Sequence, residues 1–254
     1  MKSYIKHFWE LLWAMTEKEL KIRYKNTTLG FLWAIMYPTL QAFVIGFIFQ
    51  FFYKNQPVHY GYSLFLNLLI WNFFSQTLNQ TTPSIIYQRT IIKKAKFPIA
   101  TIPLSIILCN AFHFLAGFFL FILFICSINL SKDISIFSLA FGFFLLLIFT
   151  TGLSLITSSL NVKIRDINFL TQAALVIWFY ATPILYPFSV IPHKFDYLWY
   201  INPLTSIIDL FQYGFFHTSI YPMMLFLNSI IAISTCFLGI WIFKKNKNNF
   251  DDFI

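Results

Sequence analysis

Charged residues are scarce in this chain of 254 residues. Asp, Glu, Lys and Arg together make up only 11% of it, whereas they make up about a quarter of a typical soluble domain. Hydrophobic residues reach 58% and aromatic residues 21%. A soluble domain of this size exposes too large a share of its residues to accommodate so many apolar side chains. The composition therefore predicts an integral membrane protein and excludes a disordered chain, a disulfide scaffold and a water-soluble enzyme.

The chain also lacks the short motifs of nucleotide, metal and nucleophile chemistry. No GxxxxGK[ST] phosphate-binding loop, HExxH, GxSxG or CxxC occurs. The three cysteines lie in apolar stretches, where we expect buried thiols, and the five histidines are scattered with no acid on the same helical face. We therefore expect no catalytic, metal-binding or cofactor-binding residue, and a transport function would need energy from another chain.

Six stretches contain no charged residue and are long enough to cross a membrane once. A helix needs roughly 20 apolar residues to cross the hydrocarbon core, at about 1.5 Å per residue. A β-barrel would instead show alternating segments of about ten residues, whereas runs such as 141–149 are apolar on every side. We therefore predict one all-α membrane domain over residues 1–254, with six transmembrane helices at about 31–53, 62–81, 99–127, 137–160, 168–187 and 222–243.

The distribution of Lys and Arg predicts the orientation of these helices. Six crossings place both termini on one side, and 15 of the 18 basic residues lie on that side. Only Lys54, Lys132 and Lys194 lie on the other. By the positive-inside rule, both termini and the even-numbered loops are cytoplasmic. The net charge of +9 then reports topology and contact with membrane lipids rather than binding to nucleic acid.

Two cytoplasmic segments outside the predicted spans also carry apolar side chains. Residues 8–25 place them at spacings of three and four, which predicts an amphipathic helix along the membrane interface, with Trp9 and Trp13 at headgroup depth. Residues 84–96 predict a short amphipathic helix after Pro83. This helix either docks into the groove of a partner or rests on anionic lipid.

The segment between the fifth and sixth spans is too long for a simple turn and too apolar for a solvated loop. Helices that dip into the outer leaflet fit residues 191–221, because irregular backbone at that depth needs protein around it. Asp209 in this segment is either a functional acid or part of a helix at the wet surface.

Neutral polar side chains are frequent in the first, second and fifth spans. Facing lipid they would cost free energy, so they contact other helices or line a passage for an uncharged polar substrate. Sugars suit such a passage, because their C–H faces are apolar and their hydroxyls need neutral partners. The candidates for the lining are Tyr37, Gln41, Trp71, Asn72, Gln76, Trp178 and Tyr180, with a lipid-facing position as the alternative for the aromatic residues.

Four groups of motifs, in order along the chain, resemble one family of membrane proteins. They are ELKIRYKNTTLGFLW (19–33) with Pro38; KFP (96–98) with PLS (103–105); NVKIRD (161–166) with FYATPILYP (179–187), Pro192 and NPL (202–204); and FKK (243–245) with FDDFI (250–254). By these motifs the chain resembles the membrane subunit of type-2 ABC exporters, in the branch that exports O-antigen, capsule or teichoic acid. It departs from that family after the Asn-Pro pair, where an arginine is often found and this chain has Gln212 and Tyr213.

The resemblance implies a homodimer in the bacterial inner membrane that binds two copies of a separate ATPase subunit. That subunit would bind the ATP and Mg²⁺. The expected substrate is a polysaccharide on an undecaprenyl-diphosphate carrier. Because its sugar chain is longer than the membrane is thick, we expect stepwise movement through a continuous channel.

The resemblance also implies roles for cytoplasmic and outer residues. These are Tyr87, Arg89, Lys93 and Lys94 for ATPase coupling within 84–96; Tyr200, Asp209 and Gln212 for an outer gate within 191–221; and Arg23 and Lys25 for contact with the lipid diphosphate. For Arg23 and Lys25, positive-inside topology is the alternative explanation.

Three other functions compete with polysaccharide export. The chain could be a type-2 ABC permease for a drug, an antibiotic or a lipid. An integral-membrane enzyme acting on lipid-linked sugars would need acidic or His side chains gathered near one interface, and the sequence shows no such cluster. A secondary transporter should show charges within the spans or an internal repeat, and neither is found.

Overall fold

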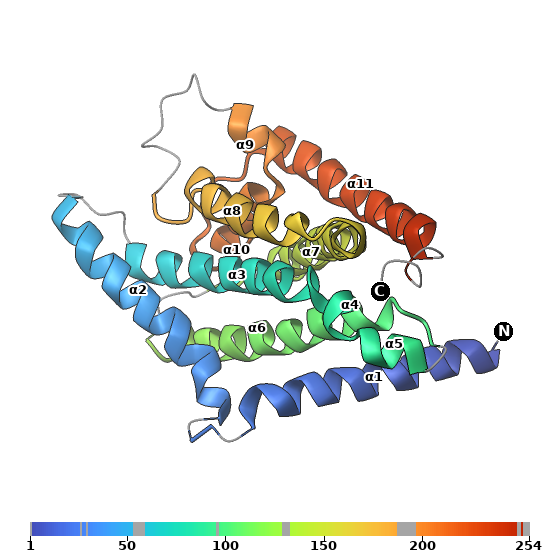
Figure 1. The fold of residues 1–254 in the computed structure, drawn as a ribbon. Helices are drawn as coiled ribbons and strands as arrows, with labels where there is room; N and C mark the ends of the chain where they lie inside the picture. The colour runs from blue at the N-terminus through green and yellow to red at the C-terminus, as the bar shows by residue number, and fades with distance from the viewer. Residues whose placement is uncertain are drawn as a thin grey trace.

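The computed structural model describes residues 2–25, 27–28, 30–52, 59–94, 97–128, 133–186, 197–247 and 250. In this part of the chain every regular element is a helix and no strand occurs, as the sequence predicts (Figure 1). The elements are α1 (Lys2–Tyr24), η1 (Gly30–Leu32), α2 (Trp33–Phe52), α3 (Tyr60–Thr81), α4 (Ser84–Tyr87), α5 (Arg89–Lys94), α6 (Thr101–Ser127), α7 (Ile136–Lys163), α8 (Asp166–Ala181), α9 (Tyr197–Ile201), α10 (Pro203–Phe216) and α11 (Pro222–Asn246).

Six helices, α2, α3, α6, α7, α8 and α11, occupy the ranges predicted as spans. Three of them, α6, α7 and α11, are long and apolar enough to cross a membrane, and α2 contains a shorter apolar stretch, Met36–Phe49. Helix α8 ends at Ala181 rather than at 187, because Thr182 precedes Pro183 and takes an extended backbone with φ −104° and ψ 140°. Residues 53 and 187 lie outside the described ranges.

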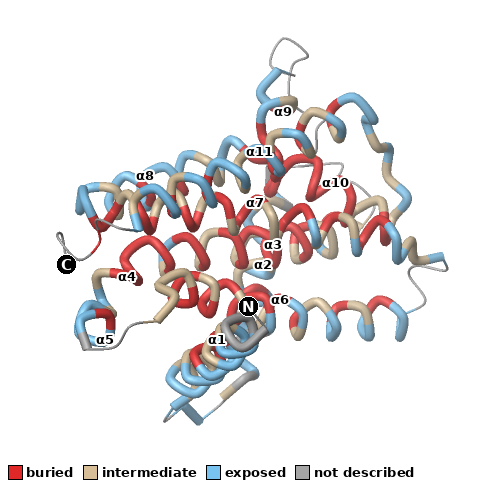
Figure 2. The backbone as a smooth tube through the Cα atoms, turned by 90° about the vertical axis from the view of Figure 1, so that its right-hand side faces the viewer, coloured by how far each residue is buried: buried red, intermediate tan, exposed pale blue. Residues whose placement is uncertain are grey.

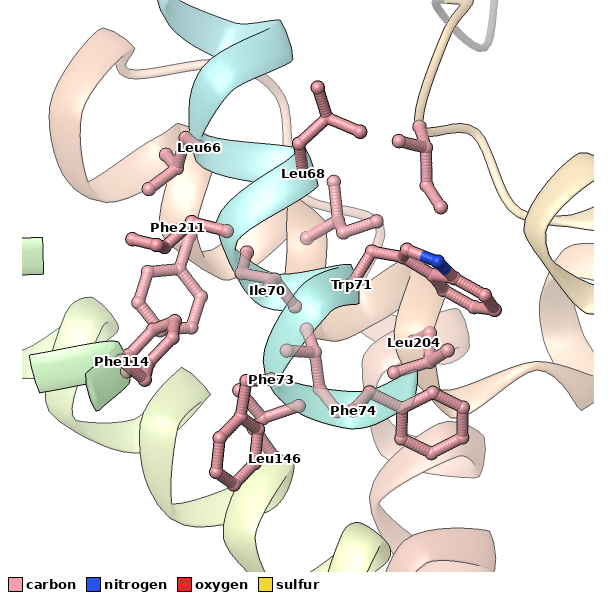
Figure 3. Packing of buried hydrophobic residues seen from close by; sticks show 14 of the residues in the cluster. Leu66, Leu68, Ile70, Trp71, Phe73, Phe74, Phe114, Leu146, Leu204 and Phe211 are labelled. Carbon is pink, nitrogen blue, oxygen red and sulfur yellow. The ribbon is translucent and has the colours of Figure 1, made fainter. Parts of the chain in front are cut away.

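Helix α3 carries much of the hydrophobic core (Figure 3). Phe74 of α3 is fully buried and stacks on Phe149 of α7, with ring centroids 5.7 Å apart. Phe114 of α6 makes an edge contact with Phe211 of α10 at 5.9 Å. Lipid tails are as apolar as these rings, so close packing rather than escape from water favours the association of the helices.

Helices α7 and α11 cross at two glycines that the sequence analysis did not single out. A Cβ atom on Gly152 would lie 2.6 Å from the backbone nitrogen of Cys236. A Cβ atom on Gly239 would overlap the carbonyl oxygen of Gly152. The two backbones can approach this closely only because neither residue has a side chain.

Helix α1 lies crosswise to the bundle. In Figure 2 it points toward the viewer, whereas α3 and α6 run across the view. Leu12 and Met15 are buried, and Trp9 and Trp13 are 61% and 60% exposed, which fits the predicted amphipathic helix. Ile22, near the C-terminal end of the helix, is 56% exposed.

The predicted single helix at 84–96 is wrong, since the structure has two short helices, α4 and α5. The break falls at Gln88, whose backbone N–H points back to the carbonyls of Ser84 and Ile86 and closes the first helix. Ile85 and Ile92 are buried in a second core cluster that also contains Phe243 of α11. Residues 95–96 lie outside the described ranges.

Helices α9 and α10 follow the segment 187–196, which lies outside the described residues. Helix α10 packs against α7, where the Ser138 hydroxyl donates to the Leu210 carbonyl at 2.7 Å. Asp209 is therefore buried, and its predicted alternative position at the wet surface is wrong. Among the cysteines, Cys109 is buried as expected, whereas Cys126 in the last turn of α6 is exposed.

Candidate functional site

Three of the candidate lining residues, Gln41, Trp71 and Tyr180, share one cavity of about 520 Å³ between α2, α3 and α8. We call it the α2–α8 cavity. Its lining consists of Gln41, Trp71, Ser75, Asn79, Gln172, Leu175, Val176, Phe179 and Tyr180. None of these residues is charged. Amide and hydroxyl groups beside aromatic rings suit a neutral polar ligand, whose hydroxyls find partners while its apolar faces contact the rings.

Regular spacing on two helices builds this cavity. On α3, Trp71, Ser75 and Asn79 follow one another at four-residue intervals and therefore share one face. Trp71 projects from the side of α3 opposite to Phe114 (Figure 3). On α8, Gln172 and Tyr180 lie on one face in the same way, and they close the cavity from across.

The other lining candidates lie elsewhere. Tyr37, Asn72 and Gln76 line a second cavity of about 300 Å³ between the end of α1 and helices α2, α3 and α6. We call it the α1–α6 cavity. Its lining is Arg23, Tyr24, Thr27, Trp33, Tyr37, Pro38, Leu69, Asn72, Phe73, Gln76, Asn110, His113 and Phe114. It thus combines one cationic side chain, several neutral hydrogen-bonding groups and an apolar wall.

A chain of hydrogen bonds connects these two cavities. Asn72 Nδ2 donates to Gln41 Oε1 at 2.8 Å. Gln41 Nε2 in turn donates to the Tyr37 hydroxyl oxygen at 3.3 Å. Trp178 belongs to neither cavity, because its Nε1 donates to Asn202 Oδ1 at 2.9 Å and its ring packs on the core. The structure therefore groups six of the seven candidates around two connected cavities and separates Trp178 from them.

Arg23 and Lys25 differ sharply in surroundings. Arg23 is half-buried, and its Nη2 donates to Gln80 Oε1 at 2.7 Å. The same oxygen accepts from Asn110 Nδ2 at 3.2 Å, which holds the Gln80 amide in place. Lys25 is exposed. Burial raises the pKa of the neighbouring Tyr24 to about 12, with Arg23 partly opposing the rise, so its hydroxyl stays protonated.

A third cavity of about 470 Å³ opens beside α4, and we call it the α1–α4 cavity. It is lined by Glu19, Ile22, Arg23, Asn79, Gln80, Pro83, Ser84, Tyr87, Gln88, Ile106, Asn168 and Gln172. It shares Arg23 with the α1–α6 cavity, and it shares Asn79 and Gln172 with the α2–α8 cavity. The α1–α4 cavity therefore adjoins both of the other cavities.

The candidate coupling residues lie on the outside of α4 and α5. Tyr87 is 77% exposed, and Arg89 and Lys93 are exposed as well. The Lys94 side chain lies outside the described part of the structure. Because Ile85 and Ile92 are buried beneath, the two short helices present a fixed polar surface to whatever lies next to them.

The outer candidates lie on α9 and α10. Gln212 Nε2 donates to Asn67 Oδ1 of α3 at 3.1 Å, and Tyr200 is half-buried. Asp209 is 6% exposed, and its Oδ2 has no hydrogen-bond partner among the described residues. This burial raises the pKa of Asp209, which lies outside the predicted spans, to about 8.

Comparison with known proteins identifies the family to which this chain belongs. A family model described as "ABC-2 type transporter" matches residues 10–216. The chain belongs to the ABC-2 type transporter family. Two relatives from Klebsiella pneumoniae, each named O-antigen export system permease protein RfbA, are 33% identical over 262 residues, covering 100% of this chain and 98% of the relative. A Myxococcus xanthus protein of the same name is 27% identical over 250 residues, covering 96% of this chain and 95% of the relative.

Membership settles the class of protein. An ABC-2 transporter chain is a multi-pass membrane transport subunit rather than an enzyme, and it works with an ATPase partner. This agrees with the missing phosphate-binding loop and with the apolar helices α6, α7 and α11.

Sequence reasoning missed several polar residues that organise this ABC-2 transporter. Asn110 supports Gln80, and Asn228 donates to the Trp199 carbonyl at 3.0 Å and to the Ser206 hydroxyl at 2.7 Å. The signal was present in the sequence, because an asparagine within an apolar helix needs a partner. The partner itself could not be identified, since it lies on a helix far away along the chain.

Proposed function

We propose that this chain is the channel-forming permease subunit of an ATP-driven exporter of polysaccharide linked to undecaprenyl diphosphate. O-antigen is the leading candidate, with capsule and teichoic acid as related ones. Similarity over the whole chain to proteins named O-antigen export permeases carries the proposal. The uncharged, aromatic α2–α8 cavity supports it, since its chemistry suits sugar hydroxyls and sugar faces.

In this proposal α2, α3, α6, α7, α8 and α11 cross the bacterial inner membrane, and both termini are cytoplasmic. The basic residues support this orientation. The second core cluster supports it too, because Met15 of α1, Ile85 of α4, Val162 of α7 and Phe243 of α11 meet there. With six crossings, these four segments should all lie at the cytoplasmic end of the bundle, and the cluster brings them together.

Two copies of the chain and two ATPase subunits form the proposed transporter, with ATP and Mg²⁺ bound by the ATPase. Helices α2 and α8, which line the α2–α8 cavity, also carry exposed apolar residues, among them Phe43, Phe47, Phe169 and Ile177. A second copy packed against these residues would close the cavity into a channel. Helices α4 and α5 would contact the ATPase, and α9 and α10 with Tyr200, Asp209 and Gln212 would form the outer gate.

Deletion of the gene tests the proposed function. We expect lipid-linked polymer to accumulate in the cytoplasm and surface polymer to be lost, and a plasmid copy should restore export. The matched control is a strain with an inactive ATPase partner, which should accumulate the same polymer. Normal surface polymer in the deletion strain would contradict polysaccharide export and favour a permease for a drug or a lipid.

A further inference from the structure

An aromatic ring from the segment that follows α11 is buried in the bundle. Residues 244–249 are all lysine or asparagine, which favour contact with water. Phe250, directly after this stretch, is nevertheless only 2% exposed. Its ring makes an edge contact with the ring of Phe243 in α11, with centroids 5.5 Å apart. Phe250 thus anchors a polar segment to the bundle through apolar contact.

Phe250 belongs to the second core cluster, at the end of the bundle where α4 and α5 lie (Figure 1). The buried members of this cluster are Met15, Ile85, Ile92, Ile102, Leu155, Val162, Phe243 and Phe250. Helices α4 and α5 contribute one buried isoleucine each, and the two phenylalanines are the largest side chains in the cluster. Removing one of these rings would leave a volume that the neighbouring side chains can close only by moving.

Helices α4 and α5 are too short to hold their position alone. Helix α4 has 4 residues and α5 has 6. Isolated helices shorter than about 12 residues are marginal in water, so packing has to stabilise both. Ile85 and Ile92 provide this packing within the second core cluster, whereas Tyr87, Arg89 and Lys93 are exposed. The position of this exposed surface therefore depends on how well the cluster beneath it is filled.

Two hydrogen bonds attach the end of α11 and the beginning of α4 to the same part of α7. Asn246, the last residue of α11, donates from Nδ2 to Ser159 Oγ at 2.9 Å. Thr82, two residues before α4, donates from Oγ1 to Thr157 Oγ1 at 3.0 Å. Thr157 and Ser159 lie within one turn of α7. Phe250 follows four residues after the first of these contacts, so its ring enters the cluster beside a fixed point.

We propose that Phe250 is a positioning residue for coupling to the ATPase. By filling the second core cluster, its ring holds α4 and α5 in the arrangement that the ATPase binds. Without the ring, α4 and α5 exchange between this arrangement and others, and the affinity for the ATPase falls in proportion to the fraction that keeps it. The contact between α4, α5 and the ATPase rests on the proposed function, whereas the dependence of α4 and α5 on Phe250 rests on their packing.

Titration of the ATPase subunit with permease in nanodiscs tests this role, with the rate of ATP hydrolysis as the readout. In Phe250→Ala we expect half-maximal stimulation to need about ten times more permease, with nearly the same maximal rate. Phe250→Leu should recover most of the loss, because leucine refills the cluster with apolar volume. Phe237→Ala is the matched control: it removes the same ring from a position on α11 that is 68% exposed, and it should change the half-maximal concentration less than about two-fold. Unchanged stimulation in Phe250→Ala, or equal changes in Phe250→Ala and Phe237→Ala, would overturn the proposal.

A spin label at Thr90, an exposed residue of α5, reports on the position of α5 directly. Thr90→Cys carries the label in a chain whose other accessible cysteines are replaced with Ala. We expect the label to become more mobile in Phe250→Ala, whereas a label at Ser234→Cys, exposed on α11, should keep its spectrum and show that the bundle is folded. Unchanged mobility at Thr90, or an equal increase at Thr90 and Ser234, would overturn the proposal.

The two experiments separate this inference from the proposed function, because the spin-label measurement needs neither the ATPase nor the polymer. Greater mobility at Thr90 with unchanged half-maximal stimulation in Phe250→Ala would overturn the coupling role. Unchanged mobility at Thr90, when the gene-deletion strain has lost surface polymer, removes this inference alone. A mobile Thr90 label and weakened stimulation, when the deletion strain keeps normal surface polymer, support this inference and remove polysaccharide export alone.

Discussion

The side-chain amide of Gln212 donates a hydrogen bond to Asn67 Oδ1 over 3.1 Å and so ties α10 to α3. Asn67 passes the contact on, because its Nδ2 donates to the carbonyl of Ile184, just beyond the end of α8, also at 3.1 Å. One asparagine thus holds three segments together at the proposed outer gate. Both contacts are made by neutral amide groups.

Replacing Asn67 with Leu should loosen this junction. The change removes both hydrogen bonds, so we expect the free energy of unfolding to fall by about 1–2 kcal/mol. Thermal unfolding of the purified protein measures it. Ser234→Ala is the control, because it removes an exposed hydroxyl bond within α11 and should stay within about 0.5 kcal/mol. Equal effects of the two changes would contradict a structural role for Asn67.

Replacing Gly152 or Gly239 with Ala should separate α7 from α11. The added methyl group would overlap backbone atoms of the other helix, which cannot move aside as a side chain could. We expect a loss of about 1–3 kcal/mol in the free energy of unfolding. Gly61→Ala is the control, since a Cβ there meets nothing within 4 Å. Unchanged melting of Gly152→Ala would show that the helices do not pack this closely.

The helices themselves could be predicted from the sequence, because uninterrupted apolar runs and charged loops determine where a helix fits in a membrane. Gln41 could be recognised as neutral and polar, and Trp71 and Tyr180 as aromatic, and the structure places the three together. Trp178 has the same chemistry and is placed elsewhere. The type of a side chain determines which roles the residue could have. The rotation of its helix and the residues that it contacts determine whether it has them.

Tertiary contacts account for what could not be predicted. The break at Gln88 depends on backbone hydrogen bonds within α4, and the burial of Asp209 depends on α10 packing against α7. The difference between Arg23 and Lys25 depends on Gln80, which is more than fifty residues away in the sequence. From the sequence the two residues look equivalent, because both are cations and the positive-inside rule counts only the number of Lys and Arg residues.

The buried carboxyl of Asp209 should make stability depend on pH. Burial raises its pKa from 3.8 to about 8, so between these values the folded protein holds a proton that the unfolded chain has lost. Stability is therefore highest below about pH 4 as far as this group is concerned, and it falls by up to about 1.4 kcal/mol per pH unit until about pH 8. Asp209→Asn should remove this part of the slope. Parallel melting curves for both proteins from pH 5 to 9 would contradict it.

Removing the charges on α5 should weaken communication with the ATPase. Exposed ion pairs contribute up to about 1 kcal/mol each, so Arg89→Ala with Lys93→Ala should weaken docking about ten-fold. The measurement is the ATPase rate of the partner as a function of added permease in nanodiscs. Lys18→Ala on α1 is the control. Unchanged stimulation in the double variant would mean that α4 and α5 rest on lipid.

Replacing Tyr180 with Ala should reduce export, whereas replacing Trp178 with Ala should reduce stability. Tyr180 is 64% exposed and lines the α2–α8 cavity, so its loss should reduce polymer export while unfolding changes by only about 0.5 kcal/mol. Trp178 donates to Asn202 and packs on Phe74 and Phe149, so its loss should cost about 3–5 kcal/mol of stability. Surface polymer and the melting temperature, measured on the same two variants, separate the two roles. Loss of export in a fully stable Trp178→Ala protein would instead place this ring in the channel.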